Sequence, residues 1–305
     1  MGRQKKDWNI DDGDFKEIKA TLDRSIEKYS HLRRRDEDPV GIVWNYESDL
    51  DREIVGLFAS SLAYGRVDLL RPATIKAMAS LGPSPSVFLL DASTQQLQEL
   101  WPDFVYRMTK GDDLIDLARA IQETLRSEGS PGNLYQEIWE DTPGQGVTRH
   151  LVTASTWVKT LRSRRLRSSL HRGFRYLLPD PEDGSTCKRL HLYFRWMVRP
   201  ADGIDLGLWP SPSPADLVIP LDTHMTRFCR YLGFLERKST DLKAALEVTE
   251  KLKTFCEEDP LLYDFPLCHL GISGDCIHKP STEHCPRCPI NSHCQLWQPR
   301  LGLIG

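Results

Sequence analysis

Residues 183–199 read DGSTCKRLHLYFRWMVR, a helix start signal followed by a strongly amphipathic pattern. The polar opening DGS contains residue types that cap helix N-termini. At 100° per residue, Lys188, Arg195 and Arg199 fall within about 20° of one direction. The large apolar side chains point roughly the opposite way. The segment therefore predicts a helix with one face in the core and one cationic face.

A second segment, residues 219–234, reads IPLDTHMTRFCRYLGF. Asp222 stands at the N-cap position of a predicted helix, whose apolar stripe contains Met225, Phe228 and Leu232. On this local pattern alone, the simplest interpretation of Asp222 is a helix cap.

Four cysteines near the C-terminus are separated by eight, two and five residues: Cys276, Cys285, Cys288 and Cys294. Four thiolates complete either a tetrahedral zinc site or one iron-sulfur cluster, and three nearby histidines could supply nitrogen ligands instead. The N-terminus has no apolar signal segment and no transmembrane run follows, which favours a reducing, cytoplasmic location over disulfides. The spacing therefore predicts a metal centre, either zinc or iron-sulfur.

Helical periodicity dominates the rest of the 305 residues. Apolar positions recur every three or four residues in the segments 15–29, 114–125 and 242–255, and residues 54–62 have the composition of a buried helix. Alternating runs typical of strands bounded by turn residues are missing from the sequence. The prediction is an essentially all-α fold.

The overall charge of −3 does not indicate nucleic acid, but one segment is strongly basic. Residues 149–175 contain Lys159 and seven arginines without any acidic residue. Such a segment is either a solvated helix face or a strip that binds phosphates.

These features together resemble a known family. A helix-opening lysine, an Asp-Thr-His-x-x-Arg helix that ends in Leu-Gly, and four later cysteines are similar to the endonuclease-III-like DNA glycosylases of the helix-hairpin-helix superfamily. The resemblance covers about residues 183–297. The wide gap between Lys188 and Asp222 is most similar to the archaeal 8-oxoguanine glycosylase branch. The block at residues 188–199 resembles most closely an uncharacterised bacterial family labelled as the domain of unknown function DUF2400.

The resemblance implies a two-lobed helical fold with the active site between the lobes. Residues 45–200 would form a helical barrel, residues 12–44 and 201–297 the second lobe with the cysteines, and residues 1–11 and 298–305 flexible tails. Lys188 would be the Schiff-base lysine and Asp222 the catalytic aspartate. Cys276, Cys285, Cys288 and Cys294 would bind a four-iron four-sulfur cluster, with zinc as the alternative.

The resemblance also implies contacts to damaged double-stranded DNA. The short Gly184-Ser185 turn replaces the glycine-rich hairpin of the family. The expected phosphate contacts are Gly184, Ser185, Arg189, Arg195, Arg199, Arg162, Arg164, Arg165 and Arg167. Trp196, Trp209 and Phe265 are the candidates for stacking on an extruded base.

The predicted function is that of a monomeric base-excision-repair DNA glycosylase with AP lyase activity, nucleoid-associated if bacterial. An oxidised base, with 8-oxoguanine favoured, is the substrate that the resemblance implies. A non-catalytic iron-sulfur DNA-binding protein and a zinc-stabilised RNA-binding protein are the alternatives.

Overall fold

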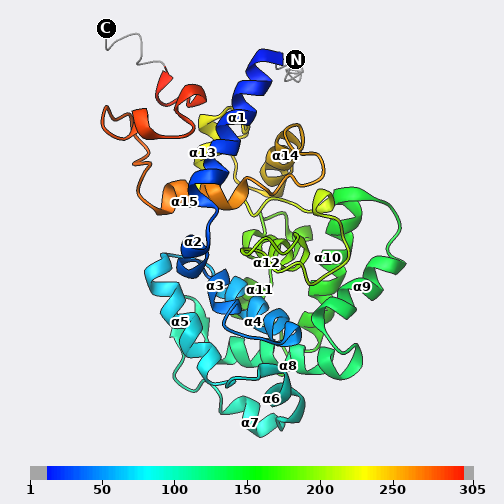
Figure 1. Ribbon diagram of the computed structural model, residues 1–305. Helices are drawn as coiled ribbons and strands as arrows, with labels where there is room; N and C mark the ends of the chain where they lie inside the picture. Colours follow the sequence, from blue (N-terminus) through cyan, green and yellow to red (C-terminus); the bar gives the residue numbers. More distant parts are fainter. Residues whose placement is uncertain (1–11, 299–305) are drawn as a thin grey trace.

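The computed structural model describes residues 12–298 and is built almost entirely from helices (Figure 1). The predicted all-α class is therefore confirmed. The predicted tail at residues 1–11 lies outside the described residues, as does the predicted C-terminal tail beyond residue 298. The helices are α1 (Asp12–Tyr29), α2 (Leu32–Glu37), α3 (Val40–Val43), α4 (Asp49–Leu62), α5 (Val67–Ala79), α6 (Pro85–Asp91), α7 (Thr94–Gln98), α8 (Gly111–Ser127), α9 (Pro131–Asp141), α10 (Gly146–Ser163), α11 (Arg172–Leu177), α12 (Lys188–Val198), α13 (Thr223–Tyr231), α14 (Leu242–Lys253) and α15 (Asp264–Ile272), with the 3-10 helices η1 (Pro181–Asp183), η2 (Pro214–Asp216), η3 (Cys285–Arg287) and η4 (Asn291–His293).

Between residues 12 and 298 there is a single sheet, a hairpin of β1 (Val105–Tyr106) and β2 (Thr109–Lys110). The strands are antiparallel, with Val105 opposite Lys110. Within this part of the chain, no helix is both long and apolar enough to cross a membrane.

Helix α4 runs through the core, as its apolar composition predicts. Ser48 caps it by accepting a hydrogen bond from the Asp51 N–H, and every residue from Glu53 to Leu62 is buried. It packs against α12, which lies near the centre of the molecule in Figure 1. The apolar face of α12 supplies this contact: a Cβ on Gly56 would meet the side chains of Met197 and Tyr193.

The two ends of the described chain lie in the same part of the molecule. Helix α1 runs beside α15 (Figure 1), and the Phe15 ring stacks on Phe255 with centroids 5.3 Å apart. At the other end of α1, the Tyr29 hydroxyl donates to Asp275 at 2.7 Å. These contacts tie the N-terminal helix to the segment that precedes the cysteines. The exact limits of the two predicted lobes stay a prediction.

Candidate active site

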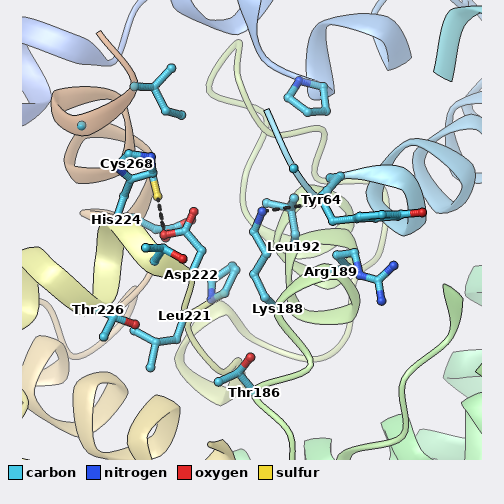
Figure 2. A pocket seen from close by; sticks show the side chains of 18 of the residues that line it. Tyr64, Thr186, Lys188, Arg189, Leu192, Leu221, Asp222, His224, Thr226 and Cys268 are labelled. Atoms are coloured by element: carbon cyan, nitrogen blue, oxygen red, sulfur yellow. Dashed lines mark hydrogen bonds between the residues drawn. The ribbon is translucent and has the colours of Figure 1, made fainter. Parts of the chain in front are cut away.

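A cavity of about 960 Å³ opens in the described part of the chain, and both predicted catalytic residues line it. Its walls come from the loop after α4, the first turns of α12 and α13, and helix α15. Lys188 and Asp222 stand 34 residues apart in the chain. In Figure 2 they lie on different sides of this cavity, with His224 and Cys268 beside Asp222.

Lys188 is the first residue of α12, so the helix begins later than its polar opening predicts. The residues Pro181–Asp183 form η1 instead, which ends at Gly184 with a φ of 76°. Cys187, at the N-cap of α12, has a φ of 45° and no side-chain cap. The half-buried Lys188 amine donates to the Ala63 carbonyl at 3.2 Å. That contact holds the amine against the wall formed by the end of α4.

Asp222 is the predicted N-cap of α13, and its Oδ1 accepts from the Met225 N–H at 2.8 Å. The predicted cap is therefore confirmed, and the same carboxylate also lines the cavity. Within residues 12–298, Lys188 and Asp222 form no direct ion pair. A substrate atom could therefore enter between them.

The pattern of the sequence missed a second cavity carboxyl, Asp264, at the start of α15. Its Oδ2 is 2.7 Å from an Arg195 Nη. Burial raises the pKa of Asp264 to about 6 against the opposing charge of Arg195, and the nearby Asp222 carboxylate adds to the rise. The sequence did contain a signal for Asp264, because it is the single acid in the apolar run LLYDFPL. An aspartate is rarely buried unless it has a charged partner, so an acid in such a run indicates a special environment.

The prediction of an exposed cationic face on α12 is wrong for Arg195 and Arg199. Both are buried, at 2% and 4% exposure. Arg195 contacts Asp205 at 3.0 Å as well as Asp264, and Arg199 pairs with Asp205 and with Asp259 at 2.9 Å. Burial disfavours the charge of Arg195, but the Asp205 and Asp264 carboxylates outweigh it and raise its pKa. Because these guanidinium groups are bound to aspartates of the protein itself, they are not available to contact phosphates.

The four named arginines of the predicted phosphate strip each bind groups of the protein itself. Arg164 forms a 2.6 Å ion pair with Glu128, and Arg167 forms ion pairs with three acids of α8. Arg162 donates to the Leu178 carbonyl at 2.9 Å and Arg165 to the Arg162 carbonyl at 2.8 Å. The segment carries no acid of its own, but α8 supplies the acids that bind Arg167, and Glu128, just after α8, binds Arg164.

Two of the three predicted stacking residues belong to the core. Trp196 is 1% exposed. Trp209 packs on Tyr135 with ring centroids 5.3 Å apart, and neither tryptophan lines the cavity. Phe265 does line it, although its ring is largely buried and lies against His269, with centroids 4.1 Å apart. The prediction of a base pocket is therefore corrected for Trp196 and Trp209.

Other aromatic residues line the cavity at the Arg189 wall, and the sequence pattern did not single them out. The Arg189 guanidinium lies 3.9 Å from the Tyr176 ring centroid and 5.0 Å from that of Tyr64. It donates to the Ser61 carbonyl at 2.7 Å. Arg189 is therefore a buried wall residue. Ser185 also lines the cavity.

The four cysteines line a second, small cavity of about 20 Å³. Within residues 12–298 no three cysteine, histidine or acidic side chains are arranged as a metal site. Burial raises the pKa of Cys288 to about 12, and the other three thiols add to the rise. Backbone N–H groups point at all four sulfurs: those of His278 at Cys276, Ser281 at Cys285, Ile290 at Cys288, and Leu296 and Trp297 at Cys294. Sulfurs that accept amide hydrogen bonds fit thiolate ligands better than ordinary buried thiols.

The cysteine segment contacts the helix that carries Asp222. The ring of His278, two residues after Cys276, lies 5.7 Å from His224 and 5.4 Å from Phe228, measured between centroids. On the opposite side, His224 packs on Gly271, where a Cβ would come within 2.2 Å of the ring. The first turns of α13 are therefore held between α15 and the cysteine segment.

Comparison with known proteins identifies one family. The model of the family described as Protein of unknown function (DUF2400) matches residues 38–273. This range includes Lys188, Asp222 and Asp264 but ends before Cys276. No curated protein and no solved structure matches the chain. The chain therefore belongs to the DUF2400 family, whose function is unknown.

Proposed function

We propose that this protein is a DNA glycosylase with AP lyase activity, acting through Lys188 and Asp222. The observation that carries the proposal is that an amine and a carboxylate from distant segments face one cavity of about 960 Å³. Cavities of roughly 300–1,000 Å³ hold compact organic ligands, and an extruded nucleotide is of that kind. An enzyme acting on a base in duplex DNA must take the base out of the stack.

In the proposed reaction, the neutral Lys188 amine attacks the sugar C1′ and forms a C1′–N bond while the bond from C1′ to the base breaks. Asp222 accepts a proton from the lysine nitrogen and stabilises the positive charge that develops on the sugar. Ring opening then gives a Schiff base, from which β-elimination cleaves the strand. The Ala63 carbonyl positions the amine before the substrate arrives.

DNA contacts are assigned to exposed cations at the cavity. Arg227 and Arg230 on α13 are exposed and line it. Arg227 makes no ion pair in the described part of the chain, whereas Arg66 on the facing wall is paired with Asp68. Arg227 is also the arginine of the Asp-Thr-His-x-x-Arg motif. It is therefore a better phosphate contact than the buried arginines of α12. An oxidised base, 8-oxoguanine in particular, is the proposed substrate on the strength of the glycosylase resemblance.

We also propose that Cys276, Cys285, Cys288 and Cys294 hold a four-iron four-sulfur cluster. The support is the shared cavity and the amide groups directed at each sulfur. Such a group cross-links the C-terminal segment and stabilises the fold. Iron and sulfide analysis of protein purified without oxygen should give equal amounts of both and little zinc. One zinc per chain without sulfide would contradict the cluster.

Borohydride trapping on a duplex that carries 8-oxoguanine tests the catalytic proposal. Wild type should give a covalent adduct at low salt, and Lys188→Gln should give none while still binding the duplex, because glutamine cannot form a Schiff base. Asp222→Asn should trap far more slowly. If wild type binds tightly but forms no adduct on 8-oxoguanine, oxidised pyrimidines or abasic sites, the protein is a non-catalytic DNA-binding protein and the proposal fails.

A further inference from the structure

We propose that Asp264 is a second catalytic carboxyl of this site, the general acid that gives a proton to the departing base. This inference rests on the proposed glycosylase function and deepens it. Asp264 lines the same cavity as Lys188 and Asp222. It begins α15, the helix whose Cys268 lies beside Asp222 in Figure 2.

The surroundings of Asp264 fix the orientation of its carboxyl group. Oδ2 faces Arg195 at 2.7 Å, and Arg195 is itself held by Asp205, which is fully buried. Oδ1 receives only the long contact of the Cys268 thiol, at 3.7 Å, in the described part of the chain. One oxygen is therefore anchored from behind by an ion pair, and the other has no strong donor.

The Cys268 thiol also lies 3.9 Å from Oδ1 of Asp222, so the two carboxyl groups are close neighbours. Two nearby carboxylates resist ionising together. Asp222 accepts a hydrogen bond from the Met225 N–H at 2.8 Å, whereas Asp264 is 2% exposed and enclosed by the protein. The other titratable groups that face Asp264 are Arg195 and Lys188 from α12, the Cys229 thiol from α13 and the Cys268 thiol from α15 itself. Where the surroundings of two neighbouring carboxyl groups differ in this way, one group can act as the acid and the other as the base.

The proton balance of the step closes with these two groups. The electron pair of the broken bond between C1′ and the base stays on the base nitrogen, which takes the proton of the Asp264 carboxyl. The new bond between Lys188 and C1′ leaves an extra proton on the lysine nitrogen, which Asp222 accepts. Asp264 ends ionised and Asp222 protonated, and exchange with solvent restores both.

The test separates base release from Schiff-base formation. Asp264→Asn is compared with wild type in single-turnover release of 8-oxoguanine and in borohydride trapping on a duplex with a preformed abasic site, where no base has to leave. The variant should release the base roughly 10²–10⁴-fold more slowly, the usual contribution of general acid catalysis, but should trap the abasic site at the wild-type rate.

Asp259→Asn is the matched control, because it removes a carboxylate from Arg199, the neighbouring arginine of α12, at a position that does not line the cavity. It should leave base release intact. Normal release by Asp264→Asn overturns the inference, and so does a parallel loss of release and trapping in both variants, which would show a structural role. If wild type neither releases a base nor traps an abasic site, the proposed function itself has failed.

A measurement on wild type alone keeps the inference testable if the variants do not fold. The ratio of base release to trapping on an abasic-site duplex should fall as pH rises through about 6, the pKa of Asp264, because both reactions use the Lys188 amine but only base release needs the Asp264 proton. A ratio that stays constant or rises over this range overturns the inference.

Discussion

The two ends of α12 place similar charges in opposite environments. Lys188 begins the helix and faces a cavity, whereas Arg195 and Arg199, which point in nearly the same helical direction, are buried among aspartates. The loop after α12 supplies Asp205, and the segment at the start of α15 supplies Asp264. Periodicity therefore gives the direction of a side chain, but the distant segments that cover that face decide whether its charge meets solvent, substrate or a buried partner.

Removal of Arg195 should give the largest loss of stability. Arg195→Gln leaves Asp205 and Asp264 without their shared cation, and breaking a buried ion pair costs about 3–5 kcal/mol. The midpoint of urea unfolding should fall accordingly. Lys159→Gln is the control, because Lys159 makes an ion pair of 2.6 Å with Glu182 at the surface, where such pairs contribute little. Equal losses in the two variants would contradict the contrast between buried and exposed charges.

Glu53 is a buried acid without a paired cation in the described part of the chain, and it extends the comparison between buried and exposed charges. Glu53 accepts from the Gly132 N–H at 2.7 Å, and no cation pairs with it in the described part of the chain. Burial raises its pKa from 4.5 to about 7. Because the folded state holds the proton more tightly, this group favours folding most below pH 4.5, and that contribution is lost as pH rises through 7.

Glu53→Gln should abolish this pH dependence. Glutamine keeps an acceptor for Gly132 but cannot ionise, so the variant should exceed wild type in stability at alkaline pH by up to about 3 kcal/mol. Below the ordinary pKa of a glutamate the two proteins should be alike. Urea unfolding of both proteins across the pH range measures the difference in the free energy of unfolding. If this free energy changes with pH in the same way for both proteins, folding does not raise the pKa of Glu53.

The smallest expected effect concerns an exposed cation of the cavity. Arg227→Gln should weaken binding to duplex DNA about equally for all sequences and reduce the slope of log affinity against log salt by about 1. Fluorescence anisotropy at several salt concentrations measures this slope. Arg164→Gln is the comparison, because Arg164 is held by Glu128, and its salt slope should match wild type. A reduced salt slope for Arg164→Gln, together with an unchanged slope for Arg227→Gln, would indicate that the basic segment contacts DNA and would contradict the role of Arg227.

Local pattern predicted much of this molecule. The helices follow from apolar periodicity, and the N-cap role of Asp222 follows from its position before an amphipathic run. The assignment of Lys188 and Asp222 to one site came from the resemblance to glycosylases, not from their spacing.

Long-range partners account for most of what could not be predicted. Arg195 meets an acid 69 residues away, and Arg167 meets one 51 residues away, so neither pairing leaves a trace in the local sequence. Trp196 lies at the border of the two helix faces, and its burial depends on how neighbouring elements close over it. Asp264 was missed for the same reason, since its cavity exists only after α12, α13 and α15 have assembled.

The most direct test of the central claim is to locate the covalent bond. Wild-type protein is reduced with borohydride on a duplex that carries 8-oxoguanine, digested, and analysed by mass spectrometry for a peptide that carries the sugar remnant. The account predicts one modified residue, Lys188, at the start of α12. A remnant on any other lysine, with Lys188 unmodified, would contradict it.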